Sequence, residues 1–228
     1  DFTVTNGGTP TITGSGSSWT VTTTASGQGA VTIAPSGTFS ASDVAGNAQT
    51  TAGGTDRSVT YDTVAPTLTL AQAAGQADPA NGSSVRFTLS SSEALDGTTI
   101  AASDFTVTNG SPVAITGSGS TWTLTTTPSA QGAVTIALSG TVSISDIAGN
   151  AATTAGGTDR TVTYDSIAPT LTLEQAAGQA DPTNGSSIQF TLSSSEALDA
   201  TTVTAADFTV TGGSTPTVTG SGSTFTVT

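Results

Sequence analysis

Acidic side chains are the only abundant groups in this sequence that could carry out chemistry. The 228 residues contain 16 Asp and Glu against three Arg and no Lys, and the formal net charge is −13. Carboxylates act as general acids and bases, or as ligands to hard divalent cations. A glycosidase would pair Glu93 with Asp96 or Asp104 across a sugar-sized cleft, but no aromatic platform lies beside these residues in the sequence. We therefore expect metal binding or turn formation, and no enzyme activity.

Several other classes of site and partner are excluded by residues that the sequence lacks. It contains no Cys and no His, which excludes disulfides, thiolate zinc sites, cysteine nucleophiles and a Ser-His-Asp triad. Binding to nucleic acid needs clustered Lys and Arg, and an anionic membrane surface would repel this charge. No stretch approaches the roughly 18 apolar residues of a membrane helix. We therefore expect neither nucleic acid nor membrane insertion.

The sequence repeats with a period of 103 residues. Asp-Phe-Thr-Val-Thr occurs at 1–5, 104–108 and 207–211, and residues 62–125 are identical to 165–228 at 47 of 64 positions. A period of this length fits a small independent domain rather than a solenoid unit. We predict the C-terminal part of one repeat at 1–62, a complete repeat at 63–165 and the N-terminal part of a third at 166–228. Because both ends fall inside a repeat, we expect the chain to be a segment of a longer polypeptide.

Apolar residues alternate with Thr and Ser in short runs, as half-buried strands require. The predicted strands of the complete repeat are 67–70, 85–89, 105–108, 113–116, 122–126, 133–138, 141–145 and 161–164. The same alternation predicts that Trp122, Trp19 and Phe225 point into cores. Seven or eight short strands per repeat predict an all-β fold of two packed sheets.

Three motifs resemble tandem bacterial immunoglobulin-like (Big) domains of large repetitive surface adhesins and exoproteins. They are 65–79, which begins Ala-Pro-Thr, Asp146-Ile-Ala-Gly-Asn150, and Thr161-Val-Thr-Tyr-Asp165. The resemblance implies an immunoglobulin-like Greek-key sandwich, a location on the bacterial surface and a role in a stalk. It also implies calcium near domain junctions, although this chain has Asp159-Arg160 where the family tends to have Asp-Asn.

Acidic residues gather at one predicted pole of each sandwich. In an immunoglobulin-like topology the linker, the loop after the second strand and the loop before the last strand lie at the same end. We therefore consider a Ca²⁺ site that draws on these residues: Asp62, Glu93, Asp96, Asp104, Asp146, Asn150, Asp159, and, at the following junction, Asp165, Glu196, Asp199 and Asp207. The alternative is that these are turn and capping residues, because Asp and Asn commonly bind local backbone amides.

These features favour an extracellular structural spacer of a repetitive bacterial surface protein, stiffened by calcium at its junctions. Two alternatives stay open: a self-assembling fibre or surface-layer component, and a module that binds carbohydrate or a host protein. Neighbouring repeats of the same chain are the expected partners, together with lateral self-association.

Overall fold

The computed structural model describes residues 1–228 except 51–53, 55, 155 and 158. The chain divides into two compact units, 1–165 and 166–228. Among the described residues, helical structure is limited to two single-turn 3-10 helices, Ala102–Asp104 and Ala205–Asp207. The fold is therefore all-β, as the alternating pattern predicts.

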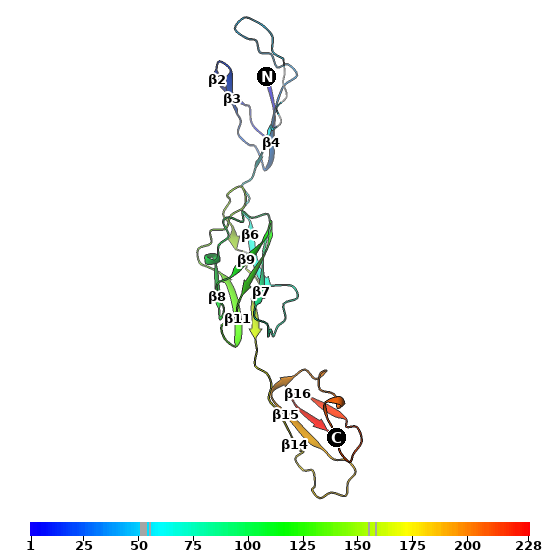
Figure 1. Cartoon of the computed structure of the whole chain (residues 1–228). Coiled ribbons are helices and arrows are strands. Elements are labelled where there is room, and N and C mark those ends of the chain that lie inside the picture. The colour runs from blue at the N-terminus through cyan, green and yellow to red at the C-terminus, as the bar shows by residue number, and fades with distance from the viewer. Residues whose placement is uncertain (51–53, 55, 155, 158) are drawn as a thin grey trace. The chain divides into compact units, whose positions relative to one another are not determined.

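Residues 63–165 contain two facing sheets (Figure 1). The first has the order β12-β6-β7-β10-β9 and the second the order β13-β11-β8. Strands of the first sheet are β6 (Thr67–Gln72), β7 (Val85–Ser91), β9 (Ala114–Ser118), β10 (Thr121–Thr126) and β12 (Thr153–Thr154). Those of the second are β8 (Phe105–Thr108), β11 (Gly132–Leu138) and β13 (Thr161–Tyr164). All pairs are antiparallel except β12 with β6, which is parallel.

The core of this repeat lies between the two sheets. Phe87 and Leu124 from the first sheet and Val134 and Val162 from the second are fully buried in one apolar cluster. Because successive side chains of a strand point to opposite faces, the Thr residues between them lie on the outer side. The alternating apolar residues of the sequence thus form a single core between the two sheets.

Residues 1–62 form a sheet and a separate hairpin, and their described side chains form no buried core. The sheet has the order β1-β4-β5 and comprises β1 (Phe2–Thr5), β4 (Gly29–Pro35) and β5 (Ser58–Tyr61). The hairpin joins β2 (Thr11–Ser15) to β3 (Ser18–Thr22). No described side chain of 1–62 falls in the buried class.

The second unit, 166–228, is one three-stranded sheet. It comprises β14 (Leu171–Gln175), β15 (Phe190–Leu198) and β16 (Val218–Val227), in that order. A small buried cluster of Leu192, Phe225 and Val227 lies on it. Phe225 is therefore a core residue, as its place in the alternation predicts.

Two expectations from the alternating pattern are wrong. Residues 141–145 are not a strand, because the amides of Ser143 and Ser145 donate to the side chains of Asp104 and Thr99 instead of to a neighbouring strand. Trp19 is 59% exposed, whereas Trp122 packs against the core and over Gly97. The indole nitrogen of Trp19 donates to the carbonyl of Gly16 at 3.1 Å, as that of Trp122 does to Gly119, but most of the Trp19 side chain stays exposed.

We expect Phe87→Ala to lower the free energy of unfolding of the complete repeat by about 3–5 kcal/mol, because the large ring leaves a cavity. Urea titration followed by Trp122 fluorescence measures this in a Trp19→Phe background, since Phe225 already occupies the equivalent position. Ile147 is 78% exposed, so Ile147→Ala is the matched control and should stay within about 0.5 kcal/mol. Equal losses for both substitutions would contradict the assignment of the core.

Candidate metal site

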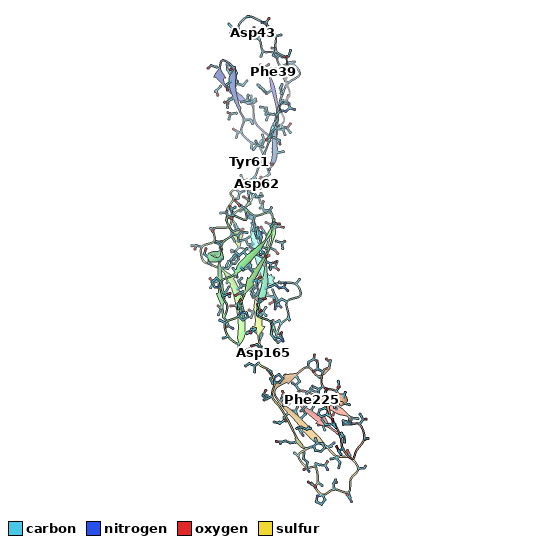
Figure 2. All side chains as sticks on the ribbon, viewed as in Figure 1. Phe39, Asp43, Tyr61, Asp62, Asp165 and Phe225 are labelled. Atoms are coloured by element: carbon cyan, nitrogen blue, oxygen red, sulfur yellow. The ribbon has the colours of Figure 1, made fainter. Side chains whose placement is uncertain are left out.

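Three carboxylates meet at one pole of the complete repeat. Asp62 comes from the linker (Figure 2), Glu93 from the segment after β7 and Asp146 from the loop before β12. One oxygen from each lies within 4.8 Å of the others. The sequence prediction that the linker and two loops share one pole therefore agrees with the placement of these three residues.

A tight turn fixes the carboxylate of Asp146. The backbone amide of Asn150 donates to Asp146 Oδ1 at 2.8 Å, and the side-chain amide of Asn150 donates to Oδ2 at 2.8 Å. Gly149 adopts a φ of 93° in this turn, a conformation that favours glycine. Burial to 3% exposure acts to raise the pKa of Asp146, but the hydrogen bonds from Asn150 and the neighbouring amides outweigh it and lower that pKa. Asp146 is therefore held as an anion.

The linker is tied to the same turn. The amide of Val64 donates to Asp62 Oδ1 at 2.9 Å, and the side-chain nitrogen of Asn150 donates to the carbonyl of Asp62 at 3.3 Å. Asn150 thus contacts the cluster through its side-chain nitrogen, which donates to both Asp62 and Asp146. A role for its side-chain oxygen as a metal ligand stays a prediction.

Within the cluster, Glu93 is the carboxylate whose pKa is raised. Desolvation raises its pKa above the usual 4.5, and the charges of Asp62 and Asp146 together with a hydrogen bond to Asp62 raise it further. A proton or a cation would relieve this repulsion. Three carboxylates are also the hard oxygen donors that Ca²⁺ prefers, so the donor set fits the ion.

The other acidic residues predicted for this junction lie outside the cluster. Asp96 accepts hydrogen bonds from the amide and hydroxyl of Thr98 at 2.9 and 2.7 Å. Asp104 is buried and accepts from the amides of Ala101 and Ser143 at 2.8 and 2.9 Å. The exposed Asp159 contributes its backbone carbonyl to the amide of Gln72. In the structure, Asp96 and Asp104 act as turn and capping residues.

The second unit repeats these local arrangements. Asp199 accepts from the amide and hydroxyl of Thr201, and Asp207 from those of Thr204. One carboxylate oxygen of Glu196 is buried without a hydrogen-bond partner. Asp165 closes the first unit, where its amide donates to the carbonyl of Ala80. The role of Asp165 and Glu196 in a shared site stays a prediction.

Sequence reasoning missed one residue that holds the linker. The side chain of Gln28 donates to the hydroxyl of Thr63 at 2.6 Å and accepts from the amide of Thr63 at 3.2 Å. A signal existed, because Gln131 follows 103 residues later in the same Ser-x-Gln-Gly context.

We expect the free energy of unfolding, measured in chelator, to fall as the pH rises above 4.5, the ordinary value for glutamic acid. Folded Glu93 releases its proton at a higher pH than unfolded Glu93, so in this window the folded state binds more protons and loses stability as they leave. The lowered pKa of Asp146 acts below 3.8, outside the window. Urea titrations at successive pH values measure the slope, and Glu93→Gln should flatten it. An unchanged slope in that variant would contradict the assignment.

Comparison with known proteins identifies the family of the complete repeat. A family model described as bacterial Ig-like domain matches residues 62–164. No curated protein and no solved structure matches the chain. No helix within the described parts of the chain has the length and apolar character to cross a membrane. Domains of this family occur in extracellular and surface proteins and are typically non-enzymatic. Residues 62–164 therefore belong to the bacterial Ig-like domain family.

Proposed function

We propose that this chain is a structural spacer segment of an extracellular bacterial surface protein, and that calcium stiffens the junction before the complete repeat. The observation that carries the proposal is the position of Asp62. This linker residue shares a carboxylate cluster with Glu93 and Asp146, which belong to the body of the repeat. An ion bound there would tie the linker to the domain that follows it.

The linker already has features of a restrained joint. The side chain of Gln28 donates to the hydroxyl of Thr63, and the carboxylate of Asp62 accepts from the amide of Val64. Pro66 is fully buried, and its carbonyl accepts from the amide of Thr153 at 2.8 Å. Proline also fixes φ at its own position. These contacts limit bending on both sides of Asp62, which suits a spacer better than a flexible tether.

Asp62, Glu93 and Asp146 would hold the ion, and Asn150 would position two of them. Bound calcium would supply positive charge that cancels the repulsion raising the pKa of Glu93. In addition, Asp146 needs no proton for this role, because its hydrogen bonds keep it ionised.

A spacer also agrees better than a binding module with the surface of the complete repeat. Within the described residues of 62–164, the large apolar side chains that are exposed are Val64 and Ile147. Carbohydrate and protein ligands are usually held by exposed aromatic or extended apolar patches. The aromatic residues Phe87, Phe105 and Trp122 instead pack in or against the core.

We expect calcium to raise the melting temperature of the complete repeat. Extracellular calcium-binding modules bind the ion weakly, with dissociation constants of about 0.1–1 mM. With a dissociation constant of about 1 mM, about 10 mM calcium would add about 1.4 kcal/mol, or several degrees for a domain of this size. Thermal melts of the whole chain, followed by Trp122 fluorescence in the Trp19→Phe background, measure the shift.

Matched variants separate calcium binding from general effects of charge. Glu93→Gln should abolish the shift, whereas Glu174→Gln removes the same charge from an exposed site outside the cluster and should preserve it. Asp104→Asn should lower the melting temperature equally with calcium and with chelator, because Asp104 binds backbone amides. A shift that survives Glu93→Gln, or no shift in the unmodified chain, would refute the calcium proposal.

A further inference from the structure

Four asparagines of this chain are followed directly by glycine: Asn6, Asn81, Asn109 and Asn184. In such a pair the backbone nitrogen of the glycine can attack the side-chain carbonyl carbon of the asparagine, because glycine has no Cβ to block the approach. The attack requires that the asparagine side chain can rotate and that the glycine amide is accessible. The four pairs differ in both respects.

The side chain of Asn109 is held at both of its polar atoms. Its Nδ2 donates to the carbonyl of Ala130 at 2.8 Å, and its Oδ1 accepts from the hydroxyl of Ser129 at 3.1 Å. The following Gly110 is crowded, because a Cβ there would lie 2.6 and 2.9 Å from atoms of two neighbouring side chains. Asn6 makes the equivalent hydrogen bond from Nδ2 at 2.8 Å. In these two pairs the fold opposes the attack.

Asn81 has neither restraint. It lies in the exposed loop between β6 and β7, and no hydrogen bond joins its side chain, or the amide of Gly82, to any residue that the structure describes. A Cβ on Gly82 would meet no heavy atom within 4 Å. Both residues line an open pocket of about 320 Å³, so water has access to the reacting atoms.

Asn184, the equivalent of Asn81 in the next repeat, is intermediate. It is also exposed, but the amide of Gly185 donates to the hydroxyl of Thr183 at 3.1 Å. The complete repeat has Ala80 in place of Thr183, and alanine has no hydroxyl. The attacking nitrogen is therefore engaged in the second unit and available in the complete repeat.

We propose that Asn81 is a site of spontaneous deamidation. The nitrogen of Gly82 forms a bond to Cγ of Asn81 and loses its proton, and the bond from Cγ to Nδ2 breaks to release ammonia. The resulting five-membered succinimide takes up one water molecule. Opening at one carbonyl gives aspartate, and opening at the other gives isoaspartate, in which the main chain runs through the former side chain. Water is the only other reagent consumed.

The position of Asn81 gives this reaction a structural effect. The preceding residue, Ala80, is buried; its amide donates to the carbonyl of Thr163 at 2.8 Å, and its carbonyl accepts from the amide of Asp165 at 2.9 Å. These bonds hold the end of β13 and the residue that follows it. Isoaspartate adds one main-chain carbon directly after Ala80, so we expect it to weaken this attachment. Aspartate adds only a charge. The complete repeat therefore loosens at its C-terminal end as the protein ages.

Incubation of the whole chain at mildly alkaline pH, followed by peptide mass spectrometry, measures the reaction. Arg57, Arg86 and Arg160 place each of the four pairs in a separate tryptic peptide. Asn81 should react first. Asn184 should react about fivefold more slowly, the effect of one hydrogen bond that must break, and Asn109 more than tenfold more slowly, because two must break. In concentrated urea the four rates should become similar, because only the fold distinguishes the pairs.

Matched variants separate the restraints. Thr183→Ala removes the hydroxyl that engages Gly185 and should raise the rate at Asn184 about fivefold, while Asn81 keeps its own rate. Gly82→Ala adds a methyl group for which the structure has room, so it should suppress the reaction at Asn81 without unfolding the repeat. Equal rates at Asn81 and Asn109 in the folded chain would overturn the proposal, as would a rate at Asn184 that Thr183→Ala leaves unchanged.

Hydrogen exchange tests the structural effect. In chain purified with isoaspartate at position 81, the amides of Ala80 and Asp165 should exchange faster than in unmodified chain, whereas Asn81→Asp should leave both rates nearly unchanged. The amide of Leu124, in the core of the same repeat, is the internal control and should stay protected in all three forms. Unchanged exchange of Ala80 and Asp165 in the isoaspartyl form would refute the loosening. The measurements are made in chelator, so they do not depend on the proposed calcium site.

Discussion

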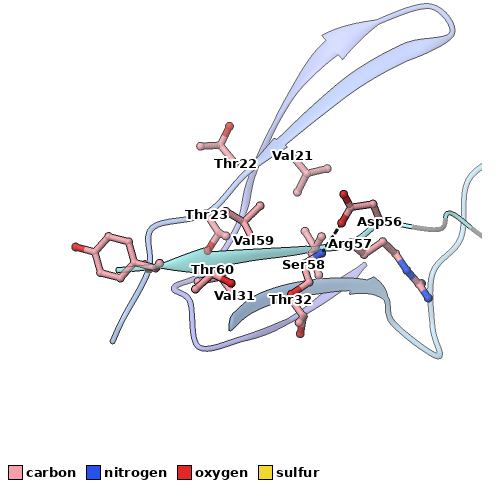
Figure 3. Close-up of a pocket in the computed structure, with 13 residues that line it drawn as sticks. Val21, Thr22, Thr23, Val31, Thr32, Asp56, Arg57, Ser58, Val59 and Thr60 are labelled. Atoms are coloured by element: carbon pink, nitrogen blue, oxygen red, sulfur yellow. Dashed lines mark hydrogen bonds between the residues drawn. The ribbon is translucent and has the colours of Figure 1, made fainter. Parts of the chain in front are cut away.

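The structure depends on a simple constraint: a strand with one apolar face is stable only when a second sheet covers that face. Each repeat is too short of charge and too rich in Thr and Ser to be held by ion pairs, so burial of alternating Leu, Val, Ile and Phe is its principal source of stability. In residues 63–165 both sheets are present and Phe87 is sealed. In residues 1–62 and 166–228 the equivalent side chains are partly exposed: Val59 (Figure 3), equivalent to Val162, is 72% exposed, and Phe190, equivalent to Phe87, is 41% exposed.

At the acidic pole, hydrogen bonds and charge repulsion matter more than burial of apolar side chains. Polar loops at the end of a sandwich need partners for their backbone amides, and Asp96 and Asp104 supply them within their own loops. Asp62, Glu93 and Asp146 instead face one another, which raises the pKa of Glu93. Only this second kind of arrangement leaves electrostatic energy that an ion could recover, and it occurs where the chain passes into the domain.

The alternating pattern predicted most strands closely, because period-two burial is a local property of the chain. It failed at 141–145, where Val142 and Ile144 alternate as in a strand but the amides of Ser143 and Ser145 donate to side chains 39 and 46 residues away. The candidate site was only partly predictable for the same reason. Asp96 and Thr98 form a local turn that the sequence could suggest, whereas the meeting of Glu93 and Asp146 depends on two loops brought together by the sheets. The predicted topology placed the loops at one pole. Of the eleven candidate residues, only Asp62, Glu93 and Asp146 are described with carboxylate oxygens within 4.8 Å of one another.

The direction of the first and last strands has a mechanical consequence. The linker leads from Asp62 into β6, and the chain leaves through β13 to Asp165. The amide of Gln72, at the end of β6, donates to the carbonyl of Asp159, just before β13 begins, so the two strands follow one another along the repeat. Tension between the two ends of the repeat therefore runs along the strands. Ladder hydrogen bonds lie across the strand direction, so the bonds of β6 and β13 share the load in shear and would break together rather than one after another. A repeat built in this way resists stretching through the number of bonds loaded at once, even though no single contact in it is strong.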